Sequence, residues 1–162
     1  MFERLDAASS TAVVQALEEA RLLGAGKLEA EHVLLALSRP TTRDVGRVLA
    51  EAGLDHDGLR RALDAETERS LEAAGVTLTS VGLLERPLPA TSQPRWGASA
   101  KRALEQALVI AKGHGDRRIH PAHILLGVLS AGEGTVPRAL AGAGIDTAAL
   151  IATAEAALPS QG

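Results

Sequence analysis

Residues 32–37 read His-Val-Leu-Leu-Ala-Leu, and residues 123–128 read His-Ile-Leu-Leu-Gly-Val. The second stretch begins 91 positions after the first, and the same offset aligns residues 12–65 with 103–156 without a gap. In this alignment, 18 of 54 positions are identical. Self-similarity at a fixed spacing indicates one supersecondary unit used twice. We therefore expect two homologous halves that bury a shared core where they meet, with a binding site at the joint.

The composition of the chain favours helices. Ala and Leu dominate, and Phe2 and Trp96 are its only aromatic residues. Ala and Leu are strong helix formers, whereas a sheet core usually needs more aromatic and β-branched residues. A chain of 162 residues therefore suits one all-α domain, or two very small domains packed together.

Charge and cysteine content exclude several classes of protein. A net charge of −3 argues against a nucleic-acid surface, which needs a clustered basic face. The absence of cysteine excludes disulfides and thiolate zinc sites and fits a reducing compartment. The chain begins Met1-Phe2-Glu3-Arg4 without a signal-peptide pattern, and no apolar run is long enough to cross a bilayer. We expect a cytoplasmic protein that binds neither nucleic acid nor membrane.

Capping residues and glycine stops divide each half into four helices. The expected helices of the first half run from Ser9 or Ser10 to Leu23, over 29–38, from Thr41 or Thr42 to Ala52, and from Asp55 or Asp57 onward. Those of the second half cover 98–112, 120–130, 135–143 and 146–158. Residues 74–95, which contain three prolines, are expected to form an irregular connector with a brief extended stretch at 76–79. The expected units are therefore 1–73, the connector 74–95, and 96–162.

Three histidines offer the main chemical alternative. His120 and His123 lie one helical turn apart, with His114 upstream, so a small metal-dependent enzyme is one hypothesis. Only one histidine position, 32/123, occurs in both halves, which favours a hydrogen bond to the backbone in the core. The sequence contains no recognisable nucleophile–histidine–acid order, and Gly24–Lys27 lacks phosphate-loop spacing. We therefore expect no catalytic residue, metal or cofactor.

Apolar residues near the joint suggest a surface. Val13 and Val14 are adjacent in a helical pattern, so both cannot face the core. Phe2 and Trp96 each precede one half, and two interpretations stay open for them. They either fix the path of the chain into a helix or form the aromatic wall of a groove that holds a partner.

Several of these stretches also resemble a known family. Met1–Arg4, residues 15–21 (QALEEAR) and residues 31–37 (EHVLLAL) are similar to the N-terminal domain of Clp-type AAA+ unfoldases, especially ClpC and ClpB. Residues 123–129 (HILLGVL) and 132–134 (GEG) repeat the signature in the second half. The resemblance covers nearly the whole chain except the connector. It implies an eight-helix, pseudo-twofold bundle of two four-helix Clp repeats, here as a stand-alone Clp N-domain protein without ATPase modules.

The resemblance also implies a function. In the family, this domain is a non-enzymatic recognition module that receives substrates and adaptors for the ATPase rings. The expected partners are peptides or unfolded proteins, Clp adaptors or the Clp ATPase and protease machinery, and cyclic-peptide antibiotics, bound by a monomer. The groove that the resemblance implies is formed by Phe2, Ser10, Val13, Val14, Leu17, Trp96 and Lys101. Trp96 replaces the usual phenylalanine and keeps an aromatic wall.

A second ligand site is implied by the resemblance. Some family members bind phosphoarginine with the acid and the hydroxyl of a GTEH motif in each repeat. This chain keeps Glu31 but has Ala30 in place of the threonine, and the second repeat has Pro121 and Ala122 instead of both residues. Because a carboxylate can hold a guanidinium group, we expect a weakened phosphoarginine-type site at Glu31 and none in the second repeat. A further hypothesis is that the connector 74–95 occupies the groove of its own chain.

Overall fold

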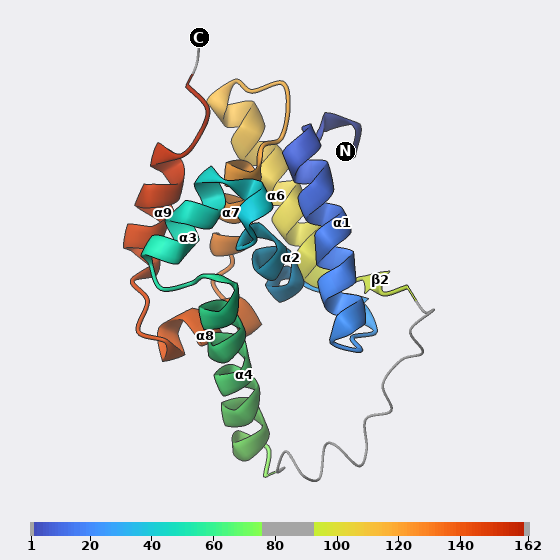
Figure 1. Cartoon of the computed structure of the whole chain (residues 1–162), viewed down its shortest axis with the longest axis vertical. Helices are drawn as coiled ribbons and strands as arrows, with labels where there is room; N and C mark the ends of the chain where they lie inside the picture. Colours follow the sequence, from blue (N-terminus) through green and yellow to red (C-terminus); the bar gives the residue numbers. More distant parts are fainter. Residues whose placement is uncertain (1, 76–92, 161–162) are drawn as a thin grey trace.

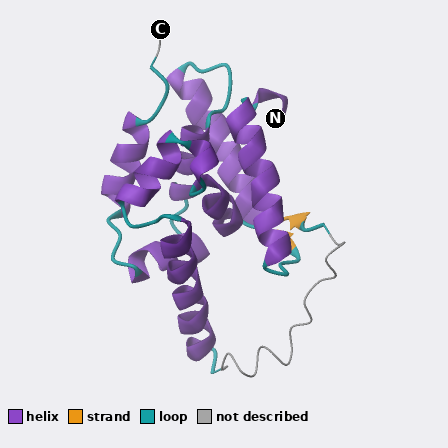
Figure 2. Ribbon diagram, in the orientation of Figure 1, coloured by secondary structure: helices purple, strands orange, loops and turns teal. Residues whose placement is uncertain are grey.

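The described part of the chain forms eight α-helices in two similar sets (Figures 1 and 2). The computed structural model describes residues 2–75 and 93–160. The first set is α1 (Ala7–Leu22), α2 (Ala30–Leu37), α3 (Asp44–Glu51) and α4 (His56–Ala73). The second set is α6 (Ala98–His114), α7 (Pro121–Leu129), α8 (Thr135–Gly142) and α9 (Thr147–Ala156). The prediction of an all-α fold with two four-helix repeats is confirmed, whereas the extended stretch expected at 76–79 lies outside the described residues.

The shared core is built around α2 and α7. In α2 every residue except Glu31 is buried, and in α7 every residue except Pro121 is buried. A helix that is apolar on all sides must be enclosed by other elements. The two helices contact each other, and α1 and α6 each contact both of them. The repeats therefore bury one common core where they meet.

The outer helices pack across the joint between the repeats. Helix α4 of the first repeat packs on α8 of the second, and α9 of the second packs on α3 of the first. These two pairings are equivalent under the offset of 91 residues. Each repeat thus covers the other, which gives the bundle its pseudo-twofold arrangement.

Two short backbone pairings also join the repeats. Strand β1 (Lys27–Leu28) pairs in parallel with β2 (Arg95–Trp96), so that Leu28 lies opposite Trp96. At the other end of the joint, Leu5 and Ile119 form an isolated parallel bridge. Under the offset of 91, Leu5 is equivalent to Trp96 and Leu28 is equivalent to Ile119. The pairings are therefore copies of one interaction, which the sequence patterns did not predict.

Two helices begin two or more residues away from their predicted starts. Helix α1 starts at Ala7 because the Asp6 side chain, rather than Ser9 or Ser10, accepts a backbone N–H of the first turn. Helix α3 starts at Asp44, since residues 40–42 form a separate 3₁₀ turn (Pro40–Thr42) before it. The predicted cap Asp55 is confirmed at α4, where its carboxylate accepts the Gly58 N–H.

None of the helices in 2–75 and 93–160 has by itself the length and apolar composition that crossing a bilayer requires. Helices α8 and α9 pass that test only when taken together, with a bend of 108° between them.

The duplication predicts the effect of one strained residue. Arg43 precedes α3 with φ of 29°, and its equivalent before α8 is Gly134 with φ of 114°. Such a backbone costs a non-glycine residue about 1–3 kcal/mol. We expect Arg43→Gly to raise the free energy of unfolding by about 1 kcal/mol, after the entropic cost of glycine is subtracted. Urea denaturation measures this change.

The control substitution is Arg47→Gly in the interior of α3. There the same change should lower the free energy of unfolding by about 1 kcal/mol, because the backbone is an ordinary helix. Equal destabilisation by both substitutions would show that Arg43 is not strained.

Candidate functional site

A histidine holds the first turn of α2 and of α7. His32 Nδ1 accepts the Glu29 backbone N–H at 2.9 Å, and His123 Nδ1 accepts that of His120 at 2.9 Å. Both rings are buried, and this burial lowers the pKa of His32 and of His123. A ring nitrogen that accepts a hydrogen bond is unprotonated, so each ring is neutral and carries its proton on Nε2. The prediction that the recurring histidine bonds the backbone is confirmed.

The three histidines of the metal hypothesis do not form one ligand set. His120 Nδ1 lies 2.7 Å from Asp6 Oδ2. Asp116 takes its place, because its Oδ2 lies 2.7 Å from His114 Nδ1 and 2.9 Å from His123 Nε2. Ligand atoms of His114, Asp116 and His123 all lie within 4.8 Å of one another. The hypothesis of a metal site formed by His114, His120 and His123 is therefore wrong, because Asp116 and not His120 lies with the other two residues.

The chemistry of His123 also disfavours metal binding by the revised cluster. A metal would need the lone pair of Nε2, and a metal-bound imidazole normally donates a hydrogen bond from its other nitrogen. In His123 that other nitrogen is an acceptor, which places the proton on Nε2. Metal binding would therefore cost the hydrogen bond that holds the start of α7. Burial acts to raise the pKa of Asp116, but His114 and His123 outweigh it and lower that pKa. The cluster is explained as a carboxylate between two imidazoles.

Each repeat completes the start of a helix in the other. At α1, Asp6 is the N-cap residue, and its carboxylate also contacts His120 of the second repeat. At α6 the N-cap is Gly97, and the carboxylate of Glu29 from the first repeat accepts the Ser99 N–H at 3.1 Å and the Ser99 hydroxyl. A Cβ on Gly97 would lie 2.2 Å from that carboxylate. The carboxylate at the start of α1 therefore belongs to the N-cap residue, Asp6, whereas the carboxylate at the start of α6 belongs to Glu29 of the opposite repeat.

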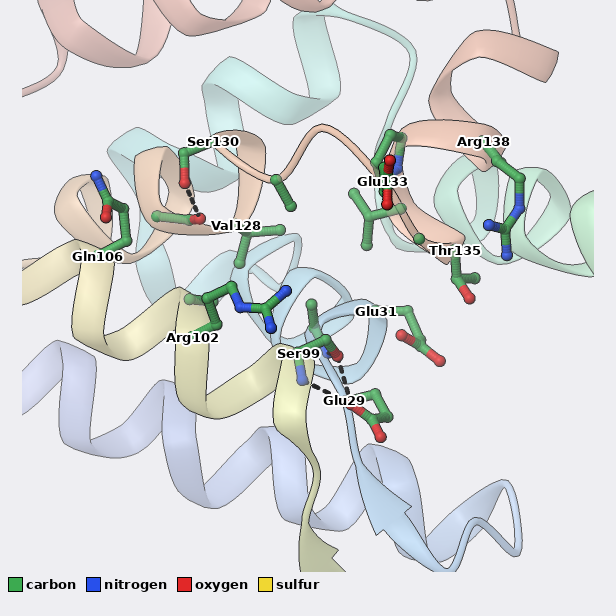
Figure 3. Close-up of a pocket in the computed structure, with 17 residues that line it drawn as sticks. Glu29, Glu31, Ser99, Arg102, Gln106, Val128, Ser130, Glu133, Thr135 and Arg138 are labelled. Carbon is green, nitrogen blue, oxygen red and sulfur yellow. Dashed lines mark hydrogen bonds between the residues drawn. The ribbon is translucent and has the colours of Figure 1, made fainter.

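A cavity of about 520 Å³, here called the seam cavity, opens beside Glu29 and Ser99 (Figure 3). Its walls come from the start of α2, from α6, from the end of α7 and from the start of α8. Its charged lining residues are Glu29, Glu31, Arg102, Glu133 and Arg138. It therefore offers both carboxylates and guanidinium groups to a ligand that enters between the repeats.

Two charges of the seam cavity are available for a ligand. Burial raises the pKa of Glu31, and the nearby Glu29 raises it further. Arg138 donates to Glu66 at 2.7 Å and is thereby held against α4. Arg102 makes no ion pair with a carboxylate in the described ranges. Glu31 is a half-buried carboxylate, and its hydrogen bond and the nearby Arg138 do not offset the effect of burial on its pKa. Such a carboxylate is suited to bind a cationic group.

A second concavity, here called the apolar hollow, lies at the joint. It has a volume of about 370 Å³ and is lined by Phe2, Trp96, Lys101, Leu104 and Glu105. The Phe2 and Trp96 rings lie 5.4 Å apart between centroids, and Phe2 is 55% exposed. The structure thus brings together Phe2, Trp96 and Lys101, three of the residues expected in the groove.

The other expected groove residues belong to α1 and do not line the apolar hollow. Val13 is 8% exposed and Val14 is 66% exposed, which confirms that the two face different ways. Ser10 is exposed and Leu17 is half-buried. Under the offset of 91, the positions in the second repeat that are equivalent to Ser10, Val13 and Val14 are Lys101, Leu104 and Glu105. Applying this offset would have identified Leu104 and Glu105, which the sequence analysis missed.

Comparison with known proteins agrees with this architecture. A family model described as the Clp repeat (R) N-terminal domain matches residues 4–82 and 95–162. The chloroplastic chaperone protein ClpC1 of Oryza sativa subsp. japonica is 33% identical over 146 residues, which are 90% of this chain and 14% of that protein. A chloroplastic ClpA homolog of Brassica napus is also 33% identical over 146 residues. The chain spans about one seventh of the length of these relatives.

Solved structures share the fold. The N-terminal domain of the chaperone ClpD from Arabidopsis thaliana superposes with a TM-score of 0.71 at 24% identity, covering 97% of this chain and 96% of that one. The Hsp104 N-terminal domain from Candida albicans gives a TM-score of 0.68 at 18% identity, covering 97% and 93%. At these identities the likeness establishes the fold.

The two buried histidines predict a pH dependence of stability. Because burial lowers the pKa of His32 and His123 in the folded state, the unfolded chain binds more protons below about pH 6.5. Their contribution to stability is therefore present at neutral pH and is lost as the pH falls below about 6.5. Replacing both residues by Gln keeps an acceptor for the backbone N–H but removes the titration.

Urea denaturation of both proteins from about pH 7.5 to pH 5.5 makes this measurement. The wild-type protein should lose more stability on acidification than the His32→Gln, His123→Gln variant. Parallel stability curves would contradict the assignment of the two rings as neutral acceptors.

Proposed function

This chain belongs to the Clp repeat N-terminal domain family, and we propose that it is a non-enzymatic module that binds peptides or unfolded protein segments at the joint between its repeats. The observation that carries the proposal is the aromatic pair of the apolar hollow. Phe2 and Trp96 are the only aromatic residues of the chain, and their rings meet across the joint, where Phe2 is exposed and the half-buried Trp96 packs against the edge of the core. Exposed aromatic side chains with charged neighbours are typical of binding hot spots.

The surface of α1 extends the proposed binding site beyond the apolar hollow. Val14 is one of the most exposed apolar side chains of the described residues, and Ser10 and Leu17 lie on the same side of α1. Val13 lies beneath them and supports the surface from the core. A peptide held by Phe2 and Trp96 would pass over these side chains. Glu3, Arg4 and Lys101 would then set its orientation from the rim.

The proposed partners follow from family membership. The module would receive Clp adaptors or substrates of a Clp ATPase and protease, as a monomer in the cytoplasm. Acting by itself, this module would serve as an adaptor, as a competitor for adaptors, or as a sink for Clp-directed peptides, including cyclic ones. A pull-down from the native cell with this chain would identify Clp proteins if the proposal holds.

Trp96 provides a direct test of the apolar hollow. It is the only tryptophan, and the chain has no tyrosine, so its fluorescence reports on the hollow alone when the peptide lacks both residues. We expect apolar peptides to change this fluorescence in a saturable way, and we expect Phe2→Ser to weaken binding about tenfold by removing one wall.

Leu22→Ser serves as the control, because Leu22 is 66% exposed but does not line the hollow. It should leave the affinity unchanged. Absence of binding at high micromolar peptide, or equal losses in both variants, would reject the apolar hollow as the binding site.

A second ligand is proposed for the seam cavity. We propose that Glu31 forms a weakened phosphoarginine-type site, in which its carboxylate would hold the guanidinium half of the ligand. Arg102 lines the same cavity and suits the phosphate half. Ala30 provides no hydroxyl, and the second repeat has Ala122 where the first has Glu31, which supports a single weak site.

Calorimetric titration with free phosphoarginine tests this site. We expect a dissociation constant on the order of millimolar and a loss of detectable binding in Glu31→Gln. Glu133→Gln is the matched control, since Glu133 lines the same cavity from the start of α8. If Glu31→Gln binds as well as the wild type, the cavity does not recognise guanidinium through Glu31.

A further inference from the structure

Four basic residues occupy equivalent positions at the two ends of the joint. Lys27 lies opposite Arg95 in the pairing of β1 with β2. Arg4 and Arg118 stand in the same positions beside the Leu5–Ile119 bridge, because each directly precedes one of its two residues. Under the offset of 91, Arg4 is equivalent to Arg95 and Lys27 is equivalent to Arg118. The duplication has therefore kept a positive charge at all four positions.

These charges do little for the folded state. All four side chains are exposed, and none forms an ion pair with a carboxylate in residues 2–75 and 93–160. Like charges directly opposite each other in a strand pairing are destabilising. Within the described residues, the one hydrogen bond that their side chains make is a long one of 3.4 Å, from Arg118 to the Leu5 carbonyl. A role in the fold therefore does not explain why the positive charges persist in both repeats.

Two of the basic residues are close in sequence to the aromatic walls of the apolar hollow. Arg95 directly precedes Trp96, and Arg4 follows Phe2 by two residues with Glu3 between them, so each aromatic wall has a basic residue close to it along the chain. The lining of the hollow itself holds one charge of each sign, Lys101 and Glu105. In Figure 1 the N-terminal turn, α1 and β2 all lie on the right side of the molecule. The positive charges that the two repeats share are therefore those of Arg4, Lys27, Arg95 and Arg118 at the ends of the joint, in a chain whose net charge is −3.

We infer that the natural partner presents an apolar anchor with acidic residues on both sides of it. The inference rests on the proposed function, since the anchor would enter the apolar hollow between Phe2 and Trp96. The acidic flanks would then reach the basic pairs at the two ends of the joint. An exposed ion pair contributes only about 0.2–1 kcal/mol, so the flanks select among apolar segments and do not create the binding.

Three synthetic peptides test the inference. All share one apolar core without Trp or Tyr, and their flanks are Asp/Glu, Ser/Gly or Lys/Arg. Titration followed by Trp96 fluorescence at low ionic strength should show the acidic peptide binding about tenfold more tightly than the neutral one, with the basic peptide weakest. At about 1 M salt the Debye length falls to roughly 3 Å, and the three affinities should converge.

A pair of charge-reversal variants assigns the effect to its residues. Lys27→Glu with Arg95→Glu keeps a like-charge pair across the strands, so it reverses the sign without adding a new cost to the pairing. It should abolish the preference for the acidic peptide. Arg47→Glu with Arg61→Glu changes the net charge equally on exposed positions of α3 and α4, and it should keep the preference.

The outcomes separate this inference from the proposed function. Equal binding of acidic and neutral peptides, or equal effects of the two double variants, overturns the inference and leaves the apolar hollow as a binding site. If no peptide of any charge changes the fluorescence of Trp96, the proposed function fails and the inference fails with it.

Discussion

The structure depends on the need to bury two short helices that are apolar on nearly every side. Helices α2 and α7 expose almost nothing, and helices of both repeats pack around each of them. The packing of α4 on α8 and of α9 on α3 solves this problem, because each repeat then covers the core of the other. Neither repeat has a complete core by itself, so we expect the two to fold as one unit.

This constraint decides which positions could diverge after duplication. The histidine that holds the start of α2 and α7 is the same in both repeats, since its hydrogen bond lies inside the shared core. At the joint, the equivalent positions differ but compensate for each other. Asp6 and His120 form one contact, whereas Gly97 and Glu29 form the equivalent one with the acid on the other partner. The joint could therefore acquire new chemistry without loss of either helix start.

The sequence predicts the features that depend on local pattern and on the repeat. Ala and Leu periodicity, the glycine stops and the offset of 91 were sufficient for eight helices and for the role of His32 and His123. The start of α1 was missed because Asp6, Ser9 and Ser10 are all good caps, and only the position of the first turn selects Asp6. The pairing of β1 with β2 was missed because a strand of two residues has no periodicity.

Contacts between distant residues explain the remaining differences at the candidate site. His120 was grouped with His114 and His123 by spacing along the chain, but its actual partner is Asp6, which is 114 positions away. In the same way, Ser99 meets Glu29 across 70 positions, and no local pattern in either segment signals that contact. The duplication is the one long-range signal in this sequence, and it relates equivalent positions rather than contacting ones.

The placement of the two aromatic residues is the strongest link between fold and function. The buried core consists of Ala, Leu, Ile and Val, and nearly every large side chain in it is fully buried. Phe2 is therefore not needed to fill space inside either repeat, and Trp96 only packs against the core from its edge. Their rings instead meet at the surface where the repeats join, with Phe2 more than half exposed. Exposed aromatic area is costly in water unless a partner covers it, and this cost is the physical reason why we propose the joint as the binding surface.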